Sequence, residues 1–403
     1  MSEPAPALRR VLGTPLLVFY GLGVIIGAGI YVLVGSVVGA AGAAAPWSFV
    51  LAGLLAGLTG LCYAELAVRF PEAAGAAAYV KEAFGSDRLS QLTGLAVAAV
   101  VIVSTASIAR GSVGYIQVFL AWPDAAIAGG LVLLFTAVAC LGVRESVGLA
   151  AAMTVVEIGG LLLVVAAGWP ALQALPQRIG ELTPALEPGA LAGVTVGAFL
   201  AFFAFIGFEN LANMAEEARR PERSLPRAIL ISLGLSTLLY ALVTAVTLLA
   251  LPHEELAASS APLLLVAEEA EWFSADLFAA IALVAVANGV LIELVMLARL
   301  LYGMARRGWL PAWLGLVHPR LRTPIPATLC GGAAVFVLTV AVPFLHLVAL
   351  TSTITLLVFA LVNLALWRLQ RRQPRSAGFR VPRFVPPIAA LANVALAAAQ
   401  FLH

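Results

Sequence analysis

Five ionisable side chains lie within the long apolar segments of this sequence: Glu65, Arg110, Glu157, Glu209 and Glu293. Because a charged side chain costs several kcal/mol in such a segment, each needs a partner or a functional role. Two interpretations follow. Arg110 pairs with Glu157 or Glu293 in a structural salt bridge, or one glutamate stays unpaired and takes up and releases a proton. Glu157 is the preferred proton-carrying group.

Five glycines lie close together in one apolar stretch near the start of the chain: Gly21, Gly23, Gly27, Gly29 and Gly35. Glycine lets a helix unwind readily, and unwound backbone within a membrane must line a cavity or be buried in protein. A break here presents N–H groups from the helix half that follows it and carbonyls from the half that precedes it. Together these suit a carboxylate and an ammonium group. Close helix packing is the alternative use of such glycines.

A second break is predicted where Gly207 interrupts the aromatic run at 202–208. Phe203 precedes this break by one turn, so it either covers a bound ligand or belongs to the core. Glu209 follows the break, and its carboxylate either satisfies unwound backbone or takes part in coupling. The second break comes five spans after the first. Because five is odd, the two halves have opposite orientations in the membrane, which predicts an inverted repeat with a shared central site.

The composition requires a membrane protein. The 403 residues are 62% hydrophobic and only 11% charged, with a mean hydropathy of +1.03, which excludes a soluble protein with a polar surface. Runs of roughly 20 apolar residues predict about eleven membrane-spanning helices, at 15–39, 46–69, 90–120, 124–142, 146–168, 190–214, 225–251, 275–304, 325–341, 345–367 and 384–402. We expect a single membrane domain with a first repeat at 15–168, a second at 190–367 and an extra helix at 384–402.

Clusters of arginine alternate along the chain with loops that are poor in positive charge. With eleven spans, all of these clusters fall on one side of the membrane. The positive-inside rule assigns that side to the cytoplasm. The sequence therefore predicts a multi-pass protein of the cytoplasmic membrane with its N-terminus inside and its C-terminus outside.

The sequence contains no sign of nucleic-acid binding, metal binding, nucleotide binding or hydrolysis. The net charge of +2 is too small to indicate nucleic acid as a partner, and there is no metal-ligand, nucleotide-binding or hydrolase motif. We therefore expect no enzyme activity, no metal and no cofactor. Without a nucleotide site, any uphill transport must be driven by an ion or substrate gradient.

Four motifs occur in the order found in the amino acid–polyamine–organocation family of permeases, which this chain resembles. They are residues 27–31, residues 63–66 with Phe70, Pro71 and Gly75, residues 205–209, and residues 298–306 with Gly308 and Pro311. The first motif is most similar to that of the cationic amino acid transporter branch. The resemblance implies an all-α, LeuT-like fold of five plus five helices, with helices 1 and 6 broken, and transport by alternating access.

The resemblance also implies which groups bind substrate. The carboxylate is held by the backbone N–H groups of Gly27, Ala28 and Gly29. The amino group meets the carbonyls of Ile25, Phe203 and Ile206, and Phe203 matches the family's gating aromatic residue. Ser104 and Ser107 offer hydroxyl groups to a side-chain pocket that the sequence leaves undefined.

Two residues depart from the family pattern. Glu157 matches the position at which many sodium-independent members carry a lysine, so the lysine mechanism does not transfer. A carboxylate there can bind a proton, bind a cation or pair with Arg110. Glu293 lies where we expect a neutral residue, and it suits a counter-charge to a cationic substrate.

We therefore predict a secondary active transporter that imports amino acids, with a proton as the coupling ion and membrane lipid around it. A polyamine or organic-amine uniporter or exchanger is the near alternative. A transporter-like nutrient sensor is a further one. The sequence leaves neutral and cationic substrates equally open.

Overall fold

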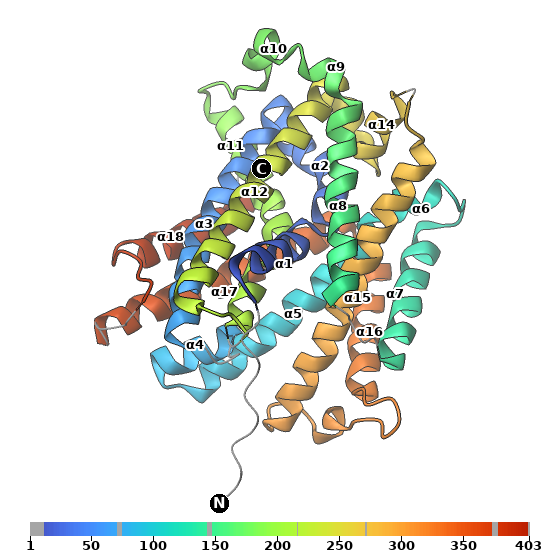
Figure 1. Ribbon diagram of the computed structural model, residues 1–403. Coiled ribbons are helices and arrows are strands. Elements are labelled where there is room, and N and C mark those ends of the chain that lie inside the picture. The colour runs from blue at the N-terminus through green and yellow to red at the C-terminus, as the bar shows by residue number, and fades with distance from the viewer. Residues whose placement is uncertain are drawn as a thin grey trace, which may run out of the picture.

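The computed structural model describes residues 12–70, 75–142, 147–215, 217–270, 272–372 and 378–401. Within these residues the chain forms a bundle of helices without a β-strand (Figure 1). Seven helical stretches are long and apolar enough to cross a membrane, and four shorter apolar helices accompany them. The predicted all-helical, multi-pass membrane fold is confirmed.

In the described part of the chain the apolar helices follow one another as eleven crossings, of which the first and the sixth are each interrupted. The first consists of α1 (Thr14–Ile26) and α2 (Gly29–Ala41). The sixth consists of α11 (Pro188–Ala201) and the 3-10 turns η2 (Phe202–Phe205) and η3 (Phe208–Met214). The others are α3 (Ala45–Arg69), α5 (Asp87–Gly111) with α6 (Val113–Gln117), α7 (Asp124–Leu141), α8 (Val147–Ala167), α12 (Pro221–Ala250), α15 (Ala275–Arg306), α16 (Ile325–Ala341), α17 (Phe344–Arg372) and α18 (Val385–Ala398).

Short helices join the crossings at the two ends of the bundle. At the lower end of the bundle in Figure 1 are α4 (Gly75–Phe84) and the connection from α15 to α16, which contains η4 (Ala312–Gly315). At the opposite end, uppermost in Figure 1, are α9 (Trp169–Leu172), α10 (Leu175–Leu182) and α14 (Pro262–Glu268), which follows α13 (His253–Ala258). The remaining short turns are η1 (Gly42–Ala44) and η5 (Ala399–Phe401).

The two interruptions occur at glycines and touch each other. The chain leaves helical geometry at Gly27, and at Gly207 it takes a φ of 120°, which favours glycine. A Cβ on Gly29 would lie 2.9 Å from Cα of Ala204 in the other break, and one on Gly207 would lie 2.8 Å from the carbonyl oxygen of Val24. Both breaks therefore require a residue without a side chain.

Each half of crossing 1 packs against the opposite half of crossing 6. α2 lies against α11, and α1 lies against η3. The second half of crossing 1 thus meets the first half of crossing 6, as two crossings of opposite direction require. This packing fits the five-plus-five inverted arrangement, while the repeat limits at 15–168 and 190–367 stay a prediction.

Hydrogen bonds tie several connections together at one end of the bundle, which we call the arginine-rich end. The carboxylate of Glu65 on α3 accepts from Arg69 (2.6 Å), from Gln370 of α17 (2.8 Å) and from the backbone N–H of Val381 (2.8 Å). Gln91 at the start of α5 donates to the carbonyl of Trp309 beyond α15 (3.4 Å). Glu65 is therefore a structural group with a bound arginine partner.

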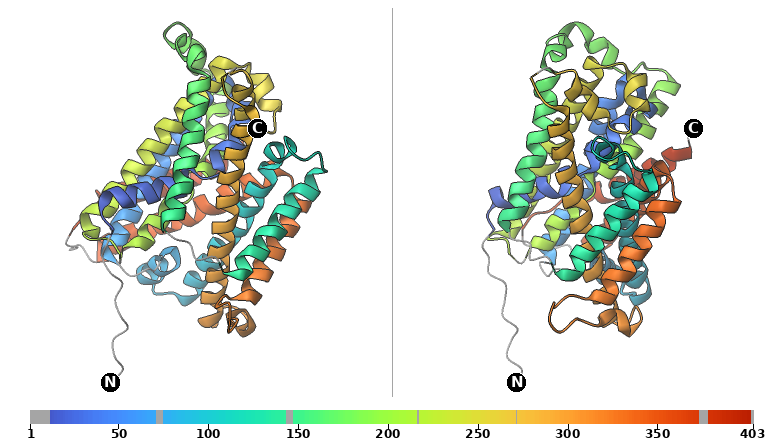
Figure 2. Two further views of the ribbon diagram at one scale, coloured as in Figure 1. Left: turned by 45° about the vertical axis from the view of Figure 1, so that its right-hand side comes forward. Right: turned by 90° about the vertical axis from the view of Figure 1, so that its right-hand side faces the viewer.

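The arginine-rich end takes its name from the basic residues in its connections. Those in the described part of the chain are Arg69, Lys81, Arg88, Arg219, Arg220, Arg223, Arg227, Arg306, Arg307, Arg320, Arg322, Arg368, Arg371, Arg372, Arg380 and Arg383. Four further arginines of the predicted clusters lie outside the described residues: Arg9, Arg10, Arg144 and Arg375. Figure 2 gives two further views of the bundle, with this end at the bottom.

Candidate functional site

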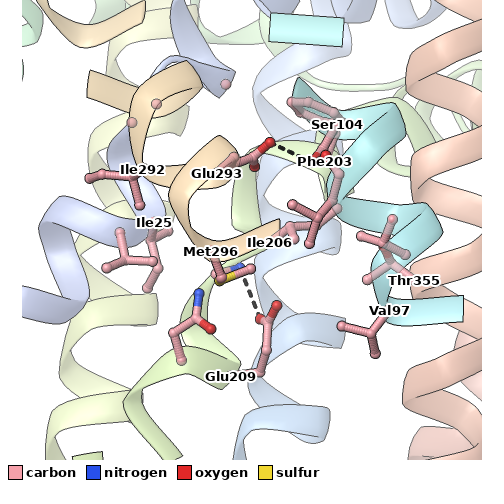
Figure 3. Close-up of a pocket in the computed structure, with 18 of the residues that line it drawn as sticks. Ile25, Val97, Ser104, Phe203, Ile206, Glu209, Ile292, Glu293, Met296 and Thr355 are labelled. Carbon is pink, nitrogen blue, oxygen red and sulfur yellow. Dashed lines mark hydrogen bonds between the residues drawn. The ribbon is translucent and has the colours of Figure 1, made fainter. Parts of the chain in front are cut away.

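A cavity of about 200 Å³ lies where the two helix breaks meet. Its wall is built from both breaks together with α3, α4, α5, α15 and α17 (Figure 3). Nine of the residues predicted from the sequence line it: Ile25, Gly27, Ala28, Gly29, Ser104, Phe203, Ile206, Glu209 and Glu293. Residues from opposite halves of the chain thus meet at one site.

The first break offers main-chain groups of both kinds to the cavity. α2 begins at Gly29, so the N–H groups of its first turn have no partner within the helix, and the positive end of its dipole lies beside the cavity wall. The carbonyl of Ile25 precedes the break. In the second break, the carbonyl of Phe203 accepts from the N–H of Ile206 (3.2 Å) and keeps a second lone pair.

The hydroxyl of Tyr240 on α12 contacts main-chain carbonyls of both breaks, and Tyr240 is not part of the cavity wall. Its hydroxyl lies 2.8 Å from the carbonyl oxygen of Ile25, 3.3 Å from that of Ile26 and 3.1 Å from that of Ala204. The sequence analysis missed this residue. A tyrosine in the middle of an apolar span is a signal that could have drawn attention to it, because a buried phenol hydroxyl needs a partner.

Glu209 serves the backbone of the second break. Its Oε2 accepts from the N–H of Gly207 at 2.8 Å (dashed line in Figure 3), which satisfies a donor that the unwound turn leaves free. This hydrogen bond supports the structural role considered for Glu209, which is to satisfy unwound backbone, over a role in coupling. The carboxyl group also lies on the wall of the cavity.

Glu293 of α15 presents its carboxyl group between α15 and α5. Its Oε2 lies 2.7 Å from the hydroxyl oxygen of Ser104 and 2.7 Å from that of Thr105, both on α5. Figure 3 draws Glu293 and Ser104 facing each other across the cavity wall. Thr105 is a second residue that the sequence analysis missed.

Glu157 lies behind the cavity wall rather than in it. It is fully buried on α8, and its Oε1 accepts from Asn288 Nδ2 at 2.8 Å. Its Oε2 is buried without a hydrogen-bond partner among the described residues. Asn288 itself lines the cavity, so a single side chain separates the Glu157 carboxyl group from the site.

Ser107 and Arg110 do not join the lining. The Ser107 hydroxyl donates to the carbonyl of Val103 in its own helix (2.8 Å). Arg110 Nη1 is buried without a hydrogen-bond partner, and within the described part of the chain no ion pair joins Arg110 to Glu157 or Glu293. The salt-bridge interpretation of Arg110 is therefore wrong for this conformation, because each glutamate has neutral partners instead.

The charged side chains on the described wall of the cavity are all acidic. Glu209 and Glu293 belong to it, while no lysine, arginine or histidine does. Residues 71–74, next to the wall residue Gly75, lie outside the described residues. Two carboxyl groups beside exposed carbonyls make a site that favours a positively charged group.

The cavity extends toward the arginine-rich end, and a cluster of aromatic rings packs on the opposite side. On the extended side it reaches Gly75 of α4 and Asn213 of η3. On the opposite side, Tyr31, Tyr115 and Phe278 pack together, with ring centroids 6.1 to 6.5 Å apart. The Tyr115 hydroxyl donates to the carbonyl of Tyr31 (2.8 Å), and all three rings are fully buried. Among the described residues, the cavity therefore reaches toward the arginine-rich end, and the aromatic cluster lies on the opposite side.

Comparison with known proteins agrees with this geometry. The sequence profile of a family described as amino acid permease matches residues 12–403. The mitochondrial cationic amino acid transporter 3 of Arabidopsis thaliana is 30% identical over 382 aligned positions, which cover 89% of this chain and 62% of the relative. The chain thus spans less than two thirds of that plant relative's length.

Two bacterial relatives are matched over more of their length. An uncharacterized transporter of Mycobacterium tuberculosis is 32% identical over 366 positions, covering 88% of this chain and 79% of the relative. The methylthioribose transporter of Bacillus subtilis is 28% identical over 415 positions, covering 96% and 87%. All three relatives are named as transporters, and the two substrates given in their names, cationic amino acids and methylthioribose, differ.

Proposed function

This chain belongs to the amino acid permease family, and on that premise we propose that it is a secondary transporter that imports amino acids through the cavity at its two helix breaks. One observation carries the proposal. The broken crossings 1 and 6 meet at a single cavity whose wall combines free helix N–H groups and main-chain carbonyls. This set matches the two charged ends of an amino acid.

In the proposed binding mode, the substrate carboxylate lies against the N–H groups of Gly27, Ala28 and Gly29. Its ammonium group meets the carbonyls of Phe203 and Ile206 across the cavity, and that of Ile25 contributes the lone pair that Tyr240 leaves free. The Phe203 ring covers the bound molecule. Support comes from the location of Ile25, Gly27, Ala28, Gly29, Phe203 and Ile206 on one cavity wall.

The arginine-rich end faces the cytoplasm in this proposal, with the N-terminus inside and the C-terminus outside the cytoplasmic membrane. The described conformation then has its cavity directed to the cytoplasm, while the cluster of Tyr31, Tyr115 and Phe278 closes the outer path. Import requires a second conformation in which the closure moves to the other side.

Proton coupling is assigned to Glu157 in this proposal. The Glu157 carboxyl group is buried, one of its oxygens has no hydrogen-bond partner among the described residues, and the other contacts Asn288 on the cavity wall. A change of protonation at Glu157 therefore alters the partner of a wall residue. This contact gives a physical route from proton uptake to the site.

Organic amines are the second candidate substrates, because the acidic wall suits a cation whether or not it carries a carboxylate. The experiment is uptake of a radiolabelled panel into proteoliposomes that contain the purified chain, with protein-free liposomes as the control. The panel pairs amino acids with their decarboxylated amines, with and without an inward proton gradient.

Accumulation of amino acids, but not of their amines, under the gradient supports the proposal. Preference for the amines favours the second candidate. Binding of a substrate without any flux would contradict transport altogether and would favour a nutrient sensor.

A further inference from the structure

The contacts around Glu293 contain more short oxygen–oxygen distances than the hydroxyl protons can fill. Glu293 Oε2 lies 2.7 Å from each of the hydroxyl oxygens of Ser104 and Thr105. Thr105 Oγ1 also lies 2.6 Å from the carbonyl oxygen of Val101, and Ser104 Oγ lies 3.2 Å from that same atom. Each hydroxyl carries one proton. Two protons therefore serve three contacts of 2.7 Å or less.

A proton on Glu293 completes the set. The Thr105 hydroxyl then donates to Val101, the Ser104 hydroxyl donates to Glu293 Oε2, and the O–H of Glu293 donates to Thr105 Oγ1. Every short contact now has its own proton. With Glu293 ionised, one of these contacts sets two oxygen lone pairs against each other, which is unfavourable for buried polar atoms. The described geometry therefore suits the neutral acid.

The groups around Glu293 supply no cation to it. Glu209 of η3 is the other acid on the cavity wall, and Arg110 of α5 forms no ion pair with Glu293 among the described residues. The described titratable groups of the elements packed against α15 are Asp87, Arg88 and Arg110 on α5, Tyr115 on α6, Asp124 and Cys140 on α7, Glu157 on α8, Glu268 on α14 and Cys330 on α16.

We propose that Glu293, Ser104 and Thr105 form a subsite that holds either a proton or the cationic end of a substrate side chain, and never both. When a guanidinium or ammonium group enters, Glu293 releases its proton to the water of the cavity, and the carboxylate pairs with the cation. A neutral side chain leaves the proton on Glu293. This inference rests on the proposed function and names its substrates as amino acids with neutral or cationic side chains.

The subsite makes the charge of the occupied site independent of the substrate. A neutral amino acid is bound together with the Glu293 proton, whereas a cationic one is bound in place of it. Each case adds one positive charge to the ionised site. Binding of cationic substrates must therefore weaken as the pH falls, because protons compete for the same carboxylate, and binding of neutral substrates must not.

The test counts protons released when ligands bind to the purified full-length chain. Isothermal titration calorimetry in two buffers of different protonation enthalpy, at one pH, measures that number. Two pairs of probes have similar shapes and different charges: arginine with citrulline, and ornithine with norleucine. We expect arginine and ornithine to release up to one proton per molecule bound, and citrulline and norleucine to release none.

Variants then assign the proton to its residue. Glu293→Gln should abolish proton release and weaken arginine binding about thirtyfold or more. Thirtyfold is the lower end of the affinity loss expected when a buried charge loses its partner. Citrulline affinity should stay within about twofold, which also shows that the variant is folded. Glu293→Asp keeps the charge and should restore part of the arginine affinity. Ser107→Ala, on the same face of α5 but outside the cavity, is the matched control.

Equal proton release by arginine and citrulline would overturn the subsite, and so would unchanged arginine affinity in Glu293→Gln. Either result leaves the proposed function in place as long as the probes bind and are transported. If none of the four probes binds, the proposed function fails, and the subsite fails with it. Should Glu293→Gln not fold, the wild-type proton count and Glu293→Asp still decide.

Discussion

The substitution Gly207→Ala tests whether the second helix break is needed in its observed form. Gly207 has a φ of 120°, where an L-residue with a side chain is strained, at a cost of about 1–3 kcal/mol. The new Cβ would also lie 2.8 Å from both the carbonyl oxygen and Cγ1 of Val24. Overpacking of this kind costs a further 1–3 kcal/mol or so. The sum is roughly 2–6 kcal/mol against the described arrangement of the breaks.

The expected result is a loss of substrate affinity together with a lower unfolding temperature. If the strain falls wholly on the binding-competent state, its lower bound of about 2 kcal/mol raises the apparent Kd by up to about thirtyfold. Calorimetric binding and thermal unfolding of the purified protein in detergent measure the two effects. The matched control is Gly234→Ala in α12, where an added Cβ meets no atom within 4 Å. That change should stabilise the helix slightly.

A double variant tests how much of the lost substrate affinity comes from the contact of the new Cβ with Val24 Cγ1. Val24→Ala removes Cγ1, one of the two atoms in the way, and leaves the carbonyl oxygen. Gly207→Ala with Val24→Ala should therefore recover part of the affinity and not all of it. Wild-type affinity and unfolding temperature in Gly207→Ala alone would refute the reasoning, because the break would then tolerate a side chain.

Three further variants address other parts of the site. Phe203→Ala should speed substrate release in a counterflow assay while the protein stays folded, and an unchanged release rate would contradict the gate. Tyr240→Phe removes the donor shared by carbonyls of both breaks and should lower stability by about 1–3 kcal/mol, measured by thermal unfolding, with wild-type stability as the opposing result. Glu157→Gln should retain substrate exchange in proteoliposomes and lose proton-driven accumulation. Accumulation equal to wild type would make Glu157 purely structural.

The sequence predicted the crossings and both breaks because these depend on local properties. Apolar length determines the crossings, and Gly29 and Gly207 mark places where no side chain fits. The order of the breaks then determines that they meet. The main-chain part of the candidate site could therefore be predicted before any contact was known.

The side-chain part depends on helix rotation, which the sequence does not define to the required accuracy. Ser104 and Ser107 lie about 60° apart around α5, from about 100° per residue, yet one lines the cavity and the other bonds to its own helix. Thr105 reaches Glu293 only because α15 packs against that edge. Glu157 lies one layer deeper than the wall because Asn288 of α15 comes between them.

The central claim is that substrate binds in the cavity between the two breaks. Substrate protection of an introduced thiol tests this claim most directly. In a background where Cys62, Cys140 and Cys330 are replaced by alanine, Ile206→Cys places a thiol on the cavity wall. Gln173→Cys, at an exposed position between α9 and α10, serves as the control.

Both variants are treated with a water-soluble thiol reagent, with and without a substrate that the wild-type protein accumulates. The account predicts that substrate slows labelling of the Ile206→Cys variant and leaves that of the Gln173→Cys variant unchanged. Labelling of the Ile206→Cys variant that does not respond to saturating substrate would contradict the central claim.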